Sequence, residues 1–433
     1  MTLSAADHTS NSFFEGSVIM LKICIVTHSY PRFKGDWSSN FIESLALAYV
    51  RNGADVTVLV PFSERYHRTP EDMGGVKIVT YQYMPFDSLH TFGYGHSMKQ
   101  DLKMNFGDML LTPFIIMMGA IKLSALLKEE NFDLIHAHWA IPNTLIAMLA
   151  RYFTRSRARI FTAFPGSDVS VITLLGWFGR ILAKLIATSD YLSCDGSDLR
   201  DDLVKAGLEE NTIDLVIYGV DENRIHFSEE SRNNLRERFG ISKNDLVLLM
   251  IGRFVPKKGF STGFLALKLI TDRIKNIKMI VVGDGALKDE YLAIIKKESL
   301  SPFVIFPGSI PLEELSEYYS ACDIFLMPSR KLPAHGLNVV VVEAMACGRP
   351  VVASDIGGNR LVVFNGTNGY LHQENNPRQL ADFVITLAEN PDLRKEMGQT
   401  SLKLVNERFN WDAIAQYYIH KYLEIDKSRV ASA

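Results

Sequence analysis

The sequence has few cysteines, and they show none of the spacings that bind zinc or form a disulfide framework. Only four occur among 433 residues, namely Cys24, Cys194, Cys322 and Cys347. They lie far apart, without a CxxC pair, and each stands among apolar neighbours. Disulfide-rich scaffolds are therefore excluded, and we expect four reduced, buried thiols, as is usual in the cytoplasm.

A strong net charge is also absent. The chain has 46 lysines and arginines against 49 aspartates and glutamates, a formal net charge of −3. The overall field therefore gives no support to a role in binding nucleic acid. With 47% hydrophobic and 22% charged residues the chain is globular, and its length suits two domains rather than one.

No hydrophobic run is long enough to span a bilayer. The run "LLTPFIIMMGAI" (110–121) is short and contains Pro113, so we expect no integral membrane helix. The first 17 residues are polar and lack the design of a signal peptide. We expect residues 1–20 to be a disordered leader, with Met20 as an alternative start, and we expect a cytoplasmic protein.

Short β-branched runs alternate with helical stretches along the chain, which is the pattern of parallel sheets with crossover helices. A polar stretch interrupts the alternation and predicts a domain boundary between about 222 and 244. We expect an α/β protein of two doubly wound, Rossmann-like domains, 21–222 and 244–408, facing one another across a cleft. A last helix within 409–433 would cross back to the first domain. The predicted strands are 22–27, 55–60, 76–81, 132–137, 159–164, 190–194, 213–217, 246–251, 278–282, 304–306, 323–327 and 350–353.

Two basic residues follow the strand predicted at 246–251. In "MIGRFVPKKGF" (250–260), Arg253 and Lys258 stand at a strand end and Gly259 opens a helix. Two cations beside a helix N-terminus can hold a pyrophosphate, although an isolated pair of this kind is usually a solvated loop. The pyrophosphate interpretation gains weight from "VVGDGAL" (281–287), where Gly283 would let a ligand approach the backbone.

The stretch "HGLNVVVVEAMACGRPVVASDIGGN" (335–359) places four valines before a helix-forming sequence and two glycine turns. We interpret it as a helix that begins near Asn338 or Val339 and points its free N–H groups at a diphosphate. Glu343, one turn in, could accept hydrogen bonds from a ribose diol. Taken alone, the stretch is explained equally well as a buried amphipathic helix with a satisfied glutamate.

Taken together, these stretches resemble the family-4 retaining glycosyltransferases of GT-B fold. The resemblance is carried by "GRFVPKKG", "FPGSIPLEELSEYYSACDIFLMPS" and "EAMACGRPVVASDIGGN", and in the first half by "DLIHAHWAIPN", "GSDV" and "IYGVDENRIHF". It covers about residues 21 to 425. It implies transfer of a hexose from a nucleotide-diphosphate sugar with retention of anomeric configuration. We expect a glycan or lipid-linked acceptor, in the synthesis of a surface polysaccharide or glycolipid.

The resemblance also implies roles for individual residues. Arg253 and Lys258 would neutralise the diphosphate, and His138 would lie beside the reacting sugar; these three are the catalytic candidates. The chain has no DxD triplet to seat a metal on the diphosphate, so we expect no metal ion and no other cofactor. The donor-binding candidates are Gly35, Arg253, Lys258, Gly283, Ile310, His335, Gly336, Leu337, Asn338, Val339, Val340 and Glu343.

Two histidines, His136 and His138, stand two residues apart at a strand end and should face the same way. A histidine at a strand end is more often structural, but the resemblance favours a role for His138, with His136 and Asp168 as supporting residues. We do not expect the pair to bind zinc, because no third ligand stands at a suitable spacing.

The sequence departs from the family pattern in three places. The family usually has two glutamates eight positions apart, and His335 replaces the first of them, which contacts the donor hexose. A usual "GFG" is here "GLN", and a usual "HGSD" is here "PGSD" (165–168). These departures concern the identity of the donor, which the sequence leaves open.

The acceptor side carries an unusual surface pattern. "RYFTRSRAR" (151–159) has four arginines, and "VITLLGWFGRILAKLIA" (171–187) is apolar, with Trp177, Arg180 and Lys184. Together they could dock on an anionic cytoplasmic leaflet, or they could be a core helix beside a solvated basic loop. Two rivals to a transferase also remain, a non-hydrolysing nucleotide-sugar 2-epimerase and a sugar-nucleotide-binding protein without turnover.

Overall fold

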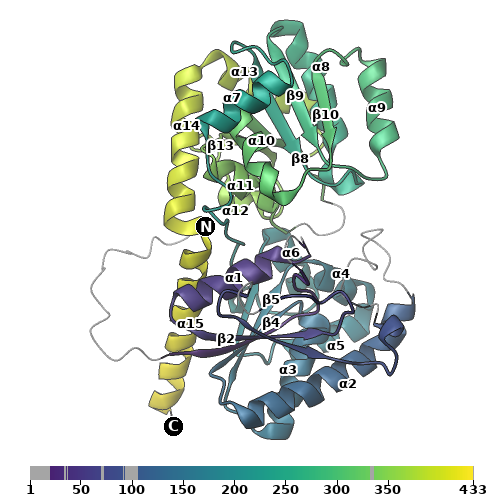
Figure 1. The fold of residues 1–433 in the computed structure, drawn as a ribbon, viewed down its shortest axis with the longest axis vertical. Coiled ribbons are helices and arrows are strands. Elements are labelled where there is room, and N and C mark those ends of the chain that lie inside the picture. The colour runs from purple at the N-terminus through teal and green to yellow at the C-terminus, as the bar shows by residue number, and fades with distance from the viewer. Residues whose placement is uncertain are drawn as a thin grey trace.

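The computed structural model describes residues 20–33, 36, 38–69, 73–90, 92, 106–331 and 336–432. It contains two parallel sheets, one in each half of the chain, and Figure 1 shows them in two bodies stacked along the long axis. The first has the strand order β3-β2-β1-β4-β5-β6-β7 and the second β10-β9-β8-β11-β12-β13. This is the two-domain, doubly wound architecture expected from the sequence. The leader predicted at 1–20 lies, except for Met20, outside the described residues.

The central strands are short apolar or β-branched runs whose side chains are buried on both faces, as a sheet covered by helices on both sides requires, whereas the edge strands β3, β7 and β10 are only partly buried. The twelve predicted strands are confirmed, with ends shifted by two residues at most. The prediction missed β13, which is only four residues long and begins with a glycine. The strands are β1 (Lys22–Val26), β2 (Asp55–Pro61), β3 (Lys77–Tyr81), β4 (Leu134–His138), β5 (Arg159–Phe164), β6 (Tyr191–Cys194), β7 (Ile213–Leu215), β8 (Leu246–Ile251), β9 (Ile277–Val282), β10 (Val304–Gly308), β11 (Ile324–Met327), β12 (Val351–Ser354) and β13 (Gly369–His372).

Helices cover both faces of the first sheet. The helix α1 packs with the C-terminal helix on one face, whereas α2, α3, α4 and α5 cover the other. These helices are α1 (Asn40–Arg51), α2 (Phe106–Glu129), α3 (Ala140–Thr154), α4 (Ser167–Leu174), α5 (Gly176–Ile186) and α6 (Ser197–Lys205).

The helix α2 is longer than the apolar run that the sequence analysis considered. The run 110–121 continues into one helix of 24 residues in which Pro113 is accommodated. By length and composition alone, the segment Leu111–Glu129 is the one described helix that could cross a membrane. Its Ile115, Leu123 and Leu126 are buried in the core beneath β1, β2 and β4, so in this fold α2 serves as a core helix with one open face.

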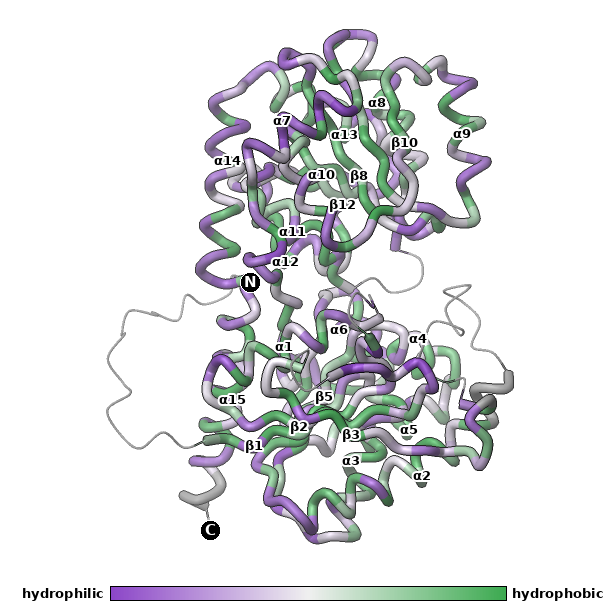
Figure 2. Tube along the Cα trace, viewed as in Figure 1, coloured by the Kyte–Doolittle hydropathy of each residue, from purple (hydrophilic) through white to green (hydrophobic). Residues whose placement is uncertain are grey.

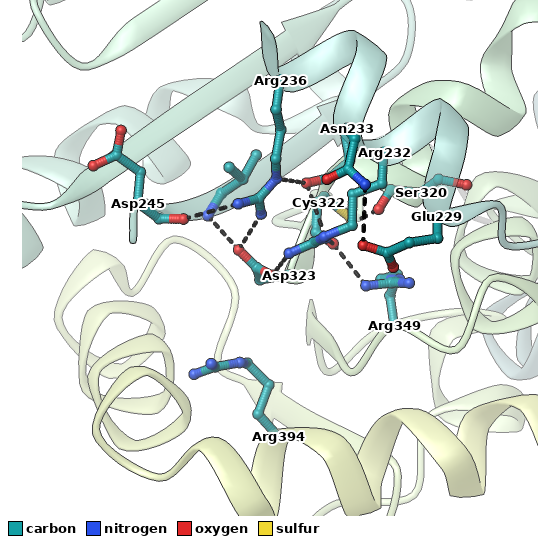
Figure 3. A network of polar contacts seen from close by, with 12 residues as sticks. Glu229, Arg232, Asn233, Arg236, Asp245, Ser320, Cys322, Asp323, Arg349 and Arg394 are labelled. Atoms are coloured by element: carbon teal, nitrogen blue, oxygen red, sulfur yellow. Dashed lines mark hydrogen bonds and ion pairs between the residues drawn. The ribbon is translucent and has the colours of Figure 1, made fainter. Parts of the chain in front are cut away.

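The helix α7 (Glu229–Arg238) belongs to the second domain, although it lies within the polar stretch where the sequence places the boundary. Arg232 and Arg236 donate to the two carboxylate oxygens of Asp323 at 2.6 and 2.7 Å (Figure 3). Burial acts to raise the pKa of Asp323, but the two guanidinium groups hold that pKa below its usual range. The remaining helices are α8 (Phe260–Arg273), α9 (Lys288–Lys297), α10 (Leu315–Ala321), α11 (Val339–Ala346), α12 (Asn359–Val362), α13 (Pro377–Glu389) and α14 (Pro391–Leu404).

The last helix, α15 (Trp411–Ser432), runs from the second domain back along the first, as Figure 1 shows in yellow. Tyr418 lies 3.1 Å from Ser193 of β6 through their hydroxyl groups, and its ring packs on His136. Arg159 donates to Asp426 at 3.0 Å. The helix α15 therefore covers the part of this face of the first sheet that α1 leaves open. All four cysteines are buried and unpaired, and burial raises the pKa of Cys24 to about 12.

Candidate active site

The strand orders locate the site before any side chain is considered. In each sheet the order reverses at one point, between β1 and β4 in the first and between β8 and β11 in the second. Open parallel sheets bind ligands at such a switch point, at the carboxyl ends of the strands. Of the predicted catalytic residues, His138 ends β4, and Arg253 and Lys258 follow β8. The fold thus places His138 at the first switch point and the two basic residues at the second.

The loop after β8 is held against the loop after β11 by glycines. Gly259 has φ +62°, and a Cβ there would overlap the carbonyl oxygen of Pro328. Lys258, in the 3₁₀ turn Pro256–Lys258 just before it, donates from Nζ to Oδ1 of Asn338 at 2.6 Å. Arg253 is exposed immediately after the strand. Both cations therefore stand at the switch point, and Lys258 reaches the start of α11.

The helix α11 begins at Val339, as predicted, with Asn338 as its N-cap residue. Asn338 is 2% exposed, and its amide nitrogen donates to Ser329 at 3.1 Å and to Asn359 at 3.0 Å. A buried, fully bonded residue at this position fixes the direction of the helix. The first N–H groups of α11, beginning at Val339 and Val340, thus open toward the same switch point as Lys258.

Glu343 lies on the inner side of α11 and is buried. Its Oε2 accepts a hydrogen bond from the hydroxyl of Tyr319 at 2.6 Å. Burial raises the pKa of Glu343, against the opposing effects of Tyr319 and of Arg224. It lines a pocket of about 230 Å³ together with Val339, Val340 and residues of the first domain, among them Phe41 of α1. Glu343, the residue predicted to bind the ribose, therefore faces a cavity between the domains.

Two further donor-binding candidates lie at the ends of β9 and β10. Gly283 follows β9 with φ +138°, and a Cβ there would overlap the carbonyl oxygen of Gly252. Its N–H donates to the carbonyl oxygen of Gly308 at 2.9 Å. Ile310 is partly buried and packs against the main core. A glycine is thus required at position 283 because the loops after β8 and β9 approach closely there. This close approach brings the loop after β9 to the edge of the site.

The histidines at the end of β4 face the same way, as predicted, with ring centroids 4.2 Å apart. Both are fully buried. Nδ1 of His136 hydrogen-bonds the hydroxyl of Tyr49 at 3.0 Å. Neither ring nitrogen of His138 has a hydrogen-bond partner among the described residues. Burial lowers the pKa of His138 to about 3, so the ring is neutral near pH 7.

Asp168 acts through the backbone next to His138. Its Oδ2 accepts from the N–H of Ala140 at 2.7 Å, and its Oδ1 accepts from Gly166 and Val169 at 3.2 and 3.0 Å. Burial raises the pKa of Asp168 to about 6, against the opposing effect of these N–H groups. The residue holds the turn that follows β4, which makes it a positioning residue rather than one that touches substrate.

Two carboxylates just before and at the start of α6, Asp195 and Asp198, were not predicted from the sequence. Asp195 is buried beside Gly336, whose missing side chain makes room for it. Its Oδ1 has no hydrogen-bond partner among the described residues. Asp198 accepts from the N–H of Gly357 at 2.8 Å and from Lys331 at 3.1 Å. Only the approach of the two domains brings these residues to the donor loop, so no local spacing could have revealed them.

Two predicted site residues, Gly35 and His335, lie outside the described residues. Leu337 is described and packs partly buried against the main core, next to Gly336. Within the described ranges, no group of three or more His, Cys, Asp or Glu side chains is placed as ligands for a metal ion.

Two family profiles match the chain, and together they cover both domains. The profile "Glycosyl transferases group 1" matches residues 231–404, and "Glycosyltransferase Family 4" matches residues 38–224. The first profile contains Arg253, Lys258 and Glu343, and the second contains His138. The second switch point and the β4 side of the first therefore fall within matched regions.

Curated relatives and solved structures agree with these matches. The chain is 30% identical to an uncharacterised glycosyltransferase of Methanocaldococcus jannaschii over 66% of this chain and 74% of that protein. It is 27% identical to the N-acetyl-alpha-D-glucosaminyl L-malate synthase of Bacillus anthracis over 71% of this chain and 78% of the synthase. A protein of Anabaena, solved in complex with UDP and glucose, has the same fold with a TM-score of 0.67. That protein is 21% identical and is matched over 93% of this chain and 100% of its own.

Proposed function

This chain belongs to the group 1, family 4 glycosyltransferases of GT-B fold, and from that premise we propose that it transfers a hexose with retention of configuration. The donor is a nucleotide-diphosphate sugar, as the solved relative with bound UDP and glucose suggests. One observation carries the proposal. Lys258 and the N-terminus of α11 meet at the switch point of the second sheet, with Arg253 beside them.

The reaction breaks the bond between the anomeric carbon and a diphosphate oxygen. An acceptor hydroxyl forms the new bond on the same face of the sugar, and its proton passes to the departing phosphate oxygen. Negative charge therefore grows on the diphosphate in the transition state. Positive groups held in place beforehand stabilise such charge without reorganising. Arg253 and Lys258, with the helix N-terminus, have this role, so the chemistry does not need a metal ion.

His138 has a different role because it is neutral. An imidazole held uncharged by burial offers one hydrogen-bond donor and one acceptor, and it adds no charge next to the sugar. We assign it to the hydroxyl groups of the reacting hexose. Asp168 keeps it in place through the turn at Ala140. The hexose thus meets neutral groups from the first domain while its leaving group meets cations from the second.

The acceptor we propose is a glycan or a lipid-linked sugar of a surface polysaccharide or glycolipid. It would be reached by an enzyme in the cytoplasm that attaches to the inner face of the plasma membrane. The support for attachment is an exposed apolar and basic surface of the first domain on α2, α3 and α5.

The experiment that tests the proposed function uses purified full-length protein with a panel of UDP-, GDP- and ADP-sugars in excess EDTA. Proton NMR of the anomeric region follows the products. Transfer, or slow hydrolysis to the retained anomer, supports the proposal. A new sugar nucleotide would identify an epimerase. Binding without turnover of any donor would identify a binding protein, and activity only with added Mg²⁺ would contradict the metal-free chemistry.

A further inference from the structure

The outer face of α2, α3 and α5 exposes an unusual amount of apolar surface. Of the 23 large apolar side chains that are exposed among the described residues, 12 lie on these helices or at the α4–α5 junction. Leu174, Tyr152 and Trp177 are 80%, 78% and 75% exposed. The twelve are Phe114, Met117, Ile121, Leu149, Tyr152, Phe153, Leu174, Leu175, Trp177, Phe178, Ile181 and Leu185. A contiguous apolar surface on this scale marks a binding site, since soluble proteins rarely expose one otherwise.

These residues form one surface because their helices are neighbours. The helices α2 and α3 pack together, and α3 contacts α5. All three cover the same face of the first sheet, on the side away from α1 and α15 (Figure 1). Figure 2 shows apolar residues recurring along α2 and α3 at this end of the domain, whereas α7 and α14 of the second domain are mostly hydrophilic. We call this surface the α2–α3–α5 face.

On α3, α5 and the segment between them the charges are almost all positive, and Asp190 on the wall of the groove is paired with Arg151 and Arg159. From Trp139 to Ser189 the chain has six arginines and lysines but a single acidic residue, the buried Asp168. The chain as a whole has a net charge of −3. Arg155, Arg157, Arg180 and Lys184 are exposed, and among the described residues no ion pair involves any of them. The basic side chains therefore remain available to an anionic partner.

A groove at the base of this face joins its apolar and basic parts. It has a volume of about 940 Å³ and lies between α3 and α5, with Ile116 of α2 on its wall. Arg155 and Arg157 line it together with Leu149, Tyr152 and Leu185. Arginines beside apolar side chains match the interfacial layer of a phospholipid bilayer, in which phosphate groups adjoin acyl chains.

We propose that the α2–α3–α5 face docks on an anionic phospholipid surface, with Arg155 and Arg157 at the phosphates and Trp177, Ile181 and Leu185 in the apolar layer. Exposed tyrosine and tryptophan are the side chains that settle at such an interface. An acidic protein would satisfy the arginines but would leave this breadth of apolar surface uncovered. The docking itself does not depend on turnover. Its use, to bring a lipid-linked acceptor to the cleft, rests on the proposed function.

The test is sedimentation of the full-length protein with vesicles at low salt. Wild type is expected to bind vesicles of phosphatidylglycerol and phosphatidylcholine, and to bind vesicles of phosphatidylcholine alone at least tenfold more weakly. Raising the salt should release it, because screening shortens the reach of surface charge. The double variant R155E/R157E is expected to lower the partition onto anionic vesicles by at least tenfold, because each basic residue near such a surface adds measurably to binding. The triple variant W177S/I181S/L185S should lose binding to a similar degree.

Matched controls lie on the second domain. Leu265 and Leu269 are exposed on α8, so L265S/L269S removes apolar surface elsewhere. The double variant K296E/K297E on α9 reverses two charges elsewhere and is the control for R155E/R157E. Both control variants should bind vesicles as wild type does, and circular dichroism should show every variant folded.

Three outcomes would overturn the proposal. One is no binding of wild type to anionic vesicles at low salt, and another is an equal loss in the control variants. The third is a stable dimer in solution that the triple variant converts to monomer, which would assign the face to a second copy of this chain. Binding of UDP, GDP and ADP, measured in parallel, should be unchanged in all variants. If wild type binds none of the three, that would count against the proposed function and leave the docking result standing.

Discussion

The two switch points of this molecule have the same topology and opposite chemistry. Each lies where the strand order reverses beside the first strand of its domain, between β1 and β4 or between β8 and β11. The second carries Arg253 and Lys258 on a glycine-held loop facing the N-terminus of α11. The first carries His138, fully buried and neutral, with a pKa lowered to about 3 by burial. One sheet edge presents two cations, whereas the other presents a neutral imidazole, with the nearest carboxylate, Asp168, bonded to backbone N–H groups.

The contrast shows that the fold supplies positions and that the loops supply chemistry. A sugar joined to a diphosphate has a neutral half and an anionic half. We propose that the two facing sheet edges, one with the neutral His138 and one with two cations, hold those halves. The domains also meet through Asp198, which accepts from Gly357 and Lys331 across the cleft. The comparison between the switch points can be tested by removing charge from one or by probing neutrality at the other.

The largest effect should follow from removing a cation at the second switch point. Replacing Arg253 or Lys258 by Ala should lower kcat by about 10²–10³, the usual cost of losing one group that stabilises developing charge. Lys257→Ala, in the same turn, is the matched control and should change kcat little. Steady-state kinetics with saturating donor measures this. Near wild-type turnover in the Arg253→Ala/Lys258→Ala double variant would refute the assignment.

The neutrality of the first switch point should appear as acid sensitivity. His138 stays neutral in the folded protein down to about pH 3, whereas in the unfolded chain it takes up a proton near its ordinary pKa of about 6.5. The unfolded state therefore binds more protons below pH 6.5, and stability falls as the pH falls. His138→Asn should remove about 1.4 kcal/mol of this loss per pH unit between pH 6.5 and 4.5.

Urea unfolding at several pH values measures the effect, with the exposed His420→Asn as the control. Equal pH dependence in wild type and His138→Asn would show that His138 is charged or exposed, and it would break the contrast between the two switch points.

A smaller effect is expected at Glu343. Glu343→Gln keeps the shape of the side chain but removes its charge, and hydrogen bonds to charged groups contribute about 1.5–3 kcal/mol. Nucleotide affinity should therefore fall by about tenfold or more, for every donor that shares the ribose. Isothermal titration with the free nucleoside diphosphate measures it, and Glu314→Gln, on the nearby 3₁₀ turn, is the control. Unchanged affinity would mean that Glu343 serves only to accept the hydrogen bond from Tyr319.

The smallest effect concerns His335, which stands where the family has a hexose-binding glutamate. His335→Ala should change the preference between competing donor sugars by several-fold, since one hydrogen bond to a neutral hydroxyl contributes about 0.5–1.5 kcal/mol. Affinity for the free nucleotide should stay the same. Competition kinetics with two or three donors would decide, and unchanged ratios would show that the hexose is recognised elsewhere.

Much of this fold could be predicted because its strands are short apolar runs separated by helical patterns. Residues close in sequence could also be placed, such as His136 beside His138, or Lys258 next to the glycine that opens α8. The contacts between domains could not be predicted, because they depend on how two bodies meet. Asp195 and Asp198 show this, since their partners Gly336 and Gly357 lie about 140 and 160 positions away. β13 was missed because its four residues, GYLH, begin with a glycine and include only two apolar side chains, too few to stand out as a strand.

The most direct test of the account is titration of UDP, GDP and ADP into the full-length protein in the presence of EDTA, by calorimetry. We expect at least one nucleoside diphosphate to bind without metal. We also expect this affinity to drop sharply in the Arg253→Ala/Lys258→Ala variant and to be unchanged in His138→Asn. Binding that needs added Mg²⁺, or that survives loss of both cations, would contradict the claim that the second switch point is a metal-free diphosphate site.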